Sequence, residues 1–109
     1  MSSKTGLLSM CRKAGRMVMG MDMVKDACST GAAKAVFTAS DFSPKSLKEI
    51  RFVCCRYGVK LYALGLTMDE IAEGVGKRSG AVAITDAGFA RSCAKGLEEI
   101  KIDENEFFG

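Results

Sequence analysis

Short apolar runs alternate with amphipathic segments along this 109-residue sequence, and this alternation constrains the fold more than any other feature. The apolar runs are bounded by turn residues, and their β-branched and aromatic content predicts buried strands at 16–19, 34–39, 60–64 and 81–85. Between them, hydrophobic residues recur at helical spacing. The pattern therefore predicts an α/β fold in which helices cover both faces of a four-stranded sheet.

Capping residues and glycines mark the limits of five predicted helices. Ser43 and Pro44 are a helix N-cap and a first helical residue, whereas Thr67 and Glu70 have the spacing of a capping box. The apolar stripe of the last helix runs from Phe89 to Ile100. The predicted helices cover 4–14, 20–31, 43–58, 67–76 and 86–100, and the chain after Lys101 is expected to be loosely held.

Length and composition predict one domain over residues 1–109, with a core of its own and an acidic tail from about 101 to 109. Hydrophobic residues make up 48% and charged residues 27%, as in ordinary globular proteins. No apolar run is long enough for a membrane span or a secretion signal, so we expect a cytoplasmic protein.

The five cysteines are odd in number and form no CxxC pair, which argues against a disulfide framework and a zinc site. Cys11, Cys28 and Cys93 fall on apolar helix faces and are expected to be core residues. The pair Cys54–Cys55 leaves open a thiol-based sensor, which requires an exposed thiol of low pKa.

The net charge is +3, and residues 98–109 carry −4, so residues 1–97 carry +7. A basic body indicates a polyanionic partner, and the acidic tail moderates non-specific attraction to it. The sequence has no histidine, no phosphate-binding GxxxxGK[ST] loop and no GxSxG elbow. We therefore expect a binding protein and not an enzyme, with no cofactor and no metal.

Two basic loops are the best candidates for binding an anion. The first, 12–16, reads RKAGR and leads through a short strand to Gly20, where a helix begins with its backbone N–H groups open. The second, 76–80, reads GKRSG. Because loops at one end of an α/β sheet gather into one surface, Arg16 and the 77–78 loop are predicted to frame that helix N-terminus.

The sequence also resembles a known family, the kink-turn-binding ribosomal proteins of the seven-Ae large-subunit type, and most closely their small bacterial YlxQ-like branch. The resemblance is carried by RKAGR at 12–16, AAKAVFTASDFSP at 32–44, YGVKLYALG at 57–65, EIAEGVGK at 70–77 and AVAITDAGFA at 81–90. It implies a three-layer α/β/α sandwich around a mixed sheet. It also implies binding of a kink-turn, an RNA duplex bent at a bulge beside sheared G·A pairs.

The family's G-x-N-E-x-x-K signature falls on residues 20–26 and is changed here. Gly20 is kept, but Asp22, Met23 and Asp26 stand at the asparagine, glutamate and lysine positions. Asp22 is able to accept hydrogen bonds from guanine N–H groups, whereas Met23 is unable to read a base edge. These departures favour RNA binding with a relaxed preference.

We therefore predict a monomeric RNA-binding protein associated with structured RNA and with the ribosome, with neither membrane nor DNA as partner. Backbone approach is assigned to three residues, a base contact to Asp22, phosphate contacts to five cations, and a bulged-nucleotide contact to Ser79. The backbone residues are Gly15, Gly20 and Met21, and the cations are Lys13, Arg16, Lys25, Lys77 and Arg78. The alternative is a protein-interaction module that uses Asp22, Asp26 and the Phe107–Phe108 tail.

Overall fold

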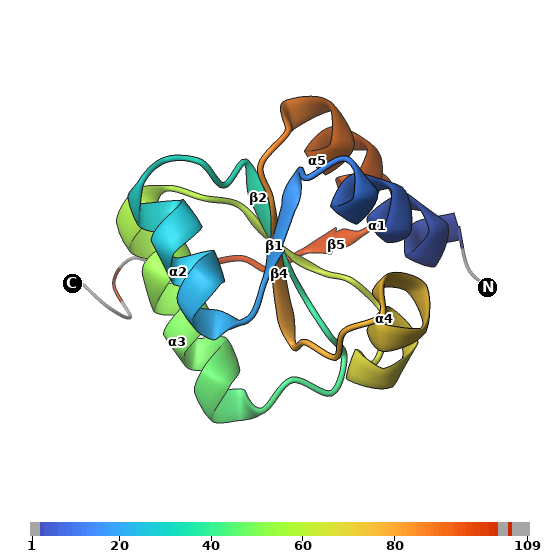
Figure 1. Ribbon diagram of the computed structural model, residues 1–109. Coiled ribbons are helices and arrows are strands. Elements are labelled where there is room, and N and C mark those ends of the chain that lie inside the picture. Colours follow the sequence, from blue (N-terminus) through green and yellow to red (C-terminus); the bar gives the residue numbers. More distant parts are fainter. Residues whose placement is uncertain (1–2, 103–104, 106–109) are drawn as a thin grey trace.

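The computed structural model describes residues 3–102 and 105 and contains a five-stranded mixed sheet at its centre (Figure 1). The strands lie in the order β1-β4-β2-β3-β5; β2 and β3 are parallel, and every other neighbouring pair is antiparallel. Their bounds are β1 Met17–Met19, β2 Ala35–Thr38, β3 Leu61–Ala63, β4 Ala81–Ile84 and β5 Glu98–Glu99.

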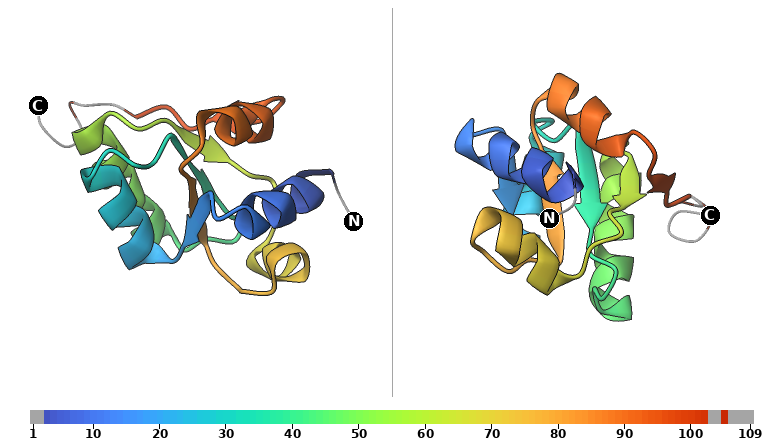
Figure 2. Two further views of the ribbon diagram at one scale, coloured as in Figure 1. Left: turned by 45° about the horizontal axis from the view of Figure 1, so that its top comes forward. Right: turned by 90° about the vertical axis from the view of Figure 1, so that its right-hand side faces the viewer.

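Five helices cover the two faces of this sheet, which confirms the predicted α/β/α sandwich. Helices α2 and α3 lie on one side, and α1, α4 and α5 lie on the other (Figures 1 and 2). Their bounds are α1 Ser3–Lys13, α2 Met21–Ser29, α3 Pro44–Tyr57, α4 Met68–Val75 and α5 Ala87–Ala94.

The core has two halves, one on each face of the sheet. Phe37, Leu8 and Ile84 are fully buried between the sheet and α1, α4 and α5. Val24 and Ile50 are fully buried on the side of α2 and α3. The central strands β2 and β4 are buried along their whole length, as expected for strands covered on both faces.

The predicted helix caps are present. Ser43 Oγ accepts the N–H of Ser46 at 3.2 Å, and Pro44 follows it at the first helical position. Thr67 and Glu70 form the reciprocal capping box of α4, with bonds of 3.1 and 3.0 Å. Gly58 ends α3 in a left-handed conformation, with φ of 69°.

The end of the chain differs from the prediction. The last helix does not continue to Ile100 but ends at Ala94, and Gly96, with φ of 79°, turns the backbone. Residues 98–99 then pair with Tyr62 and Ala63 as a fifth strand, so the expected count of four strands is wrong. The bond from Ile100 N–H to Leu61 O, at 2.8 Å, extends this pairing.

Part of the predicted acidic tail can be placed. Ile100 and Ile102 pack against the α2–α3 half of the core, so the chain is held at least to residue 102. Most of the tail, with Phe107 and Phe108, lies outside the described residues. None of the helices in the described ranges has the length and apolarity needed to cross a bilayer.

Candidate nucleic-acid interface

The turn between β1 and α2 is built on Gly20. Its φ of 95° and ψ of 150° lie in a region that glycine adopts freely and other residues avoid. As the N-cap residue it has no side chain to cover the first N–H groups of α2. The positive end of α2 is therefore open at the surface, beside the exposed Asp22 and Met23.

A hydrogen-bonded clasp joins this turn to the 76–80 loop. Gly20 N–H donates to Ser79 Oγ at 3.1 Å and to Ala81 O at 3.2 Å. The Ser79 hydroxyl in turn donates to Ala81 O at 2.7 Å. Ser79 is only 7% exposed, so its hydroxyl holds the turn and the loop together and has little surface available for contact with a nucleotide.

A groove of about 210 Å³ lies next to the clasp and is lined by residues from four parts of the chain. Arg12 comes from the end of α1, Lys77 from the 76–80 loop, and Met23 from the first turn of α2, while β1 forms the remaining wall. The Arg12 guanidinium also donates to Val75 O at the C-terminus of α4, where a cation is favoured. The groove thus combines two cations with the exposed thioether of Met23.

Two of the predicted phosphate-binding cations have acidic partners. Arg78 Nε lies 2.9 Å from Asp69 Oδ1, and both side chains are largely exposed. Lys25 forms an ion pair with Glu49 of α3. Such pairs contribute little to stability, about 0–1 kcal/mol, so either cation can exchange its partner for a phosphate. Lys77 is exposed and carries its charge directly at the groove.

The structure gathers only part of the predicted site at one end of the sheet. Gly20, Met21 and Asp22 lie beside the 77–79 loop, as expected. Arg16 lies at the opposite end of β1, where its carbonyl accepts the N–H of Thr85 at 2.9 Å. Lys13 and Gly15 precede it there, so these three residues do not frame the α2 N-terminus.

Arg12 and Met23 were not among the predicted site residues, although both line the groove. Arg12 belongs to the RKAGR loop in sequence, but its position in α1 directs it to α4. Its place in the sequence was the available signal: Arg12 lies in the last turn of a helix, directly after the buried Cys11, and so beside the core. Met23 is 55% exposed, and its apolar side chain lines the groove.

Cys11, Cys54 and Cys93 are buried thiols with raised pKa values, whereas a hydrogen bond with Cys54 lowers the pKa of the buried Cys28. Burial raises the pKa of Cys11 and of Cys93 to about 11. Hydrogen bonding to Cys28 and burial raise the pKa of Cys54, so this thiol does not meet the requirement for a sensor. Cys55 is half-buried. Within residues 3–102 and 105, no cluster of three or more metal-ligating side chains occurs.

Two of the solved structures that share this fold show the likeness. A protein with unknown function from Bacillus halodurans C superposes with a TM-score of 0.80 and 23% identity, over 87% of this chain and 96% of that one. The Giardia lamblia 15.5kD RNA binding protein gives a TM-score of 0.68 and 17% identity, over 84% and 82% of the two chains. At these identities the likeness establishes the fold alone.

Sequence comparison adds the family. A search of curated proteins finds no significant match. A sequence model of the "Ribosomal protein L7Ae/L30e/S12e/Gadd45 family", however, matches residues 4–94, from the first turn of α1 to the last residue of α5. That range includes Gly20, the clasp and the groove. The chain belongs to the ribosomal protein L7Ae/L30e/S12e/Gadd45 family.

Proposed function

We propose that this protein binds structured RNA through a surface formed by the α2 N-terminus, the 76–80 loop and the groove between them. The observation that carries the proposal is the clasp between Gly20 and Ser79, because it holds an open helix N-terminus beside the groove lined by Arg12 and Lys77. Backbone N–H groups and cations that converge on one surface suit a phosphate backbone. Family membership and the RNA-binding Giardia relative support the same function.

Within this surface the roles differ. Arg12, Lys77 and Arg78 contact phosphates and supply affinity, whereas Asp22 accepts hydrogen bonds from a guanine edge and supplies selectivity. Met23 packs against the sugar or base of the same nucleotide, since its apolar side chain is exposed at the groove. Lys13, Gly15 and Arg16 extend the contact along the RNA toward the other end of β1. Lys25 contributes when its pair with Glu49 opens.

The target we propose is a kink-turn or a related bend in ribosomal RNA, bound by a monomer in the cytoplasm, and we assign the chain to the YlxQ-like branch that its sequence resembles. The proposal concerns binding and not catalysis. Gly20 provides an open N-terminus to α2, but Asp22, Met23 and Asp26 replace the side chains of the signature. We therefore expect a preference for kinked RNA that is weaker than a complete signature provides.

The test is binding to a kink-turn RNA and to the same duplex with its G·A pairs replaced, at one salt concentration. Preference for the kinked form supports a kink-turn target, whereas equal, salt-sensitive binding to both indicates a general RNA binder. The Lys77→Ala variant should bind more weakly, and the matched Lys48→Ala variant, changed on the exposed surface of α3, should not. Absence of binding to either RNA at low salt would overturn the proposal.

A second candidate is a protein-interaction module, favoured by the surface between α2 and α3. A groove of about 460 Å³ there is lined by both acids of α2, Asp22 and Asp26, and by two aromatic residues of α3. These are Phe52 and Tyr57, which are 38% and 43% exposed. Exposed aromatic side chains are enriched where proteins dock. This candidate becomes the leading one if RNA binding fails.

A further inference from the structure

A cavity lies on the opposite side of the sheet from α2, beneath α5. It has a volume of about 710 Å³, within the range of small-molecule sites. It exists because small residues face each other across a helix–sheet interface: Ala87, Ala90 and Ala94 of α5 lie over Ala35 of β2. Alanine side chains are too short to fill the space that larger residues occupy elsewhere in the core.

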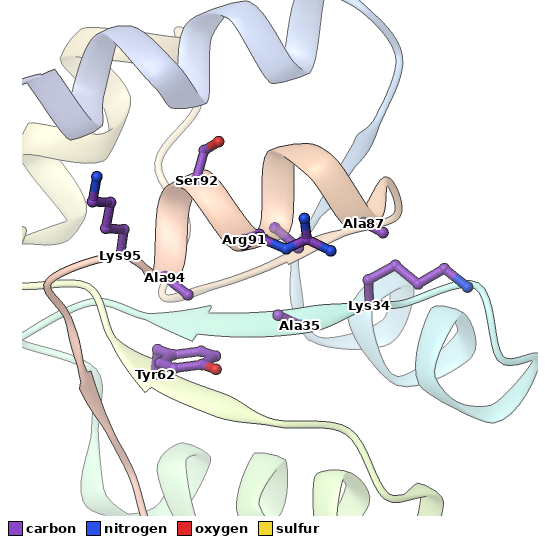
Figure 3. A pocket seen from close by; sticks show the side chains of 9 residues that line it. Lys34, Ala35, Tyr62, Ala87, Arg91, Ser92, Ala94 and Lys95 are labelled. Carbon is purple, nitrogen blue, oxygen red and sulfur yellow. The ribbon is translucent and has the colours of Figure 1, made fainter.

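One end of the cavity is aromatic. Tyr62 of β3 stacks on the buried Phe37 with ring centroids 5.5 Å apart and an interplanar angle of 20°. This contact fixes the Tyr62 ring, which lies under Ala94 on the floor of the cavity (Figure 3). A fixed, half-buried ring is a surface on which another planar ring can stack at little entropic cost.

The other end is cationic. Arg91 of α5 and Lys34, the residue before β2, lie toward the Ala87 end, whereas Ser92 and Lys95 point away from the cavity (Figure 3). Three of the nine described lining residues are basic and none is acidic. Two acids lie nearby and are engaged: Asp86 accepts the Phe89 N–H at 2.9 Å, and Glu99 lies 3.3 Å from Lys101 Nζ.

We propose that this cavity binds a single nucleotide, with its base on Tyr62 and its phosphate at Arg91 and Lys34. The arrangement matches both parts of such a ligand: an apolar slot with an aromatic floor for the base, and two cations beyond it for the phosphate. The bound nucleotide is either a free mononucleotide or an unpaired nucleotide of an RNA, since both present a base and a phosphate to the cavity.

This site is separate from the proposed RNA surface. Strand β4 lies between β1, which lines the groove, and β2, which lines the cavity. The cavity and the groove share no lining residue. Nucleotide binding in the cavity can therefore be tested independently of RNA binding at the groove. The Lys77→Ala variant should retain nucleotide binding.

The chain offers a specific probe, because its only tyrosines are Tyr57 and Tyr62. In a Tyr57→Phe background labelled with fluorotyrosine, the single fluorine resonance comes from the cavity. Adenosine 5′-monophosphate should shift this resonance saturably, and a single-stranded oligoadenylate tests the RNA source. A shift with the oligonucleotide alone identifies RNA as the source, and a shift with the mononucleotide identifies a free nucleotide as a ligand.

Variants localise the effect. Arg91→Gln should weaken mononucleotide binding about tenfold, as expected for loss of a charge-assisted phosphate contact, whereas Arg56→Gln on α3 should not change it. Ala94→Leu should fill the cavity and abolish binding, with thermal unfolding as the check on its fold. Two outcomes would overturn the proposal: equal shifts with inorganic phosphate, or the absence of any shift with both the mononucleotide and the oligonucleotide.

Discussion

The backbone N–H of Gly20 and the hydroxyl of Ser79 are hydrogen-bonded at 3.1 Å, although 59 positions separate them in sequence. This bond links the start of α2 to the loop that carries Lys77 and Arg78. The geometry of the proposed RNA surface therefore depends on a buried hydroxyl that needs no contact with RNA. Loss of that hydroxyl should affect both stability and binding.

Replacement of Ser79 by alanine tests this dependence. Ser79→Ala leaves the Gly20 N–H with Ala81 O as its remaining acceptor and should lower the free energy of unfolding by about 1–3 kcal/mol. RNA affinity should also fall in conditions where the variant is folded. Urea unfolding and RNA titration measure the two effects, with the exposed Ser92→Ala as control. Wild-type RNA affinity in a destabilised variant would show that the clasp serves folding alone.

Cations at the two ends of β1 should differ in their effect on RNA binding. Lys77→Ala should weaken binding roughly threefold to tenfold and reduce the slope of log K against log salt by about 1. Arg16→Ala should have a smaller effect, because Arg16 lies at the far end of β1 from Gly20. Titrations at several salt concentrations give both slopes. A larger loss for Arg16→Ala would move the centre of the interface to the 12–16 loop.

Two helical glycines should respond in opposite directions to alanine. A Cβ at Gly74 of α4 would lie 2.1 Å from Thr5 Cγ2 and 3.0 Å from Thr5 O, whereas a Cβ at Gly6 of α1 meets nothing within 4 Å. Gly74→Ala should therefore destabilise the fold by about 1–3 kcal/mol through overpacking between α1 and α4. Gly6→Ala should stabilise it by up to about 1 kcal/mol through helix propensity.

Thermal or urea unfolding of the two variants measures these effects. A Thr5→Ser change removes Cγ2 and should recover part of the loss caused by Gly74→Ala, which a double-mutant cycle can quantify. Equal stability of Gly74→Ala and the wild type would mean that the two helices separate without cost.

The buried thiols predict a loss of stability in alkali. The folded-state pKa of Cys11 and Cys93 is about 11, against 9.0 for an unperturbed thiol. Above pH 9 the unfolded chain releases these protons first, so the stabilisation is complete below pH 9 and is lost as pH rises toward 11. The loss is on the order of 2 kcal/mol per thiol. Unfolding free energies from pH 8 to 11 should fall less steeply in Cys93→Ala, and an identical slope would contradict the assignment.

Local signals in the sequence predicted most of the fold. The Thr67–Glu70 capping box, the Ser43–Pro44 helix start and the glycine stop at Gly58 each depend on residues close in the chain, and all are present. Strand β5 was missed because Glu98 and Glu99 have low strand propensity. Their pairing arises from the free edge of β3, a partner more than 30 positions away, which no local pattern reveals.

The sequence predicted less of the proposed site than of the fold. The open N-terminus of α2 followed from Gly20, a local feature, but the position of Arg16 depended on which end of β1 faces the 76–80 loop. That Arg12 lines the groove depended on the packing of α1 against α4. The cavity under α5 was not visible at all, because alanine on an inward helix face usually indicates close packing and here leaves space.

Strand β5 also has a consequence for how copies of the protein meet. An unpaired β3 would expose a row of backbone donors and acceptors, a template on which another chain can add and begin aggregation. Glu98 and Glu99 pair with β3 at this edge. The strand stops after these two residues, because Ile100 leaves the edge and packs on the α2–α3 half of the core. Charged side chains on so short an edge strand disfavour the addition of a second strand there.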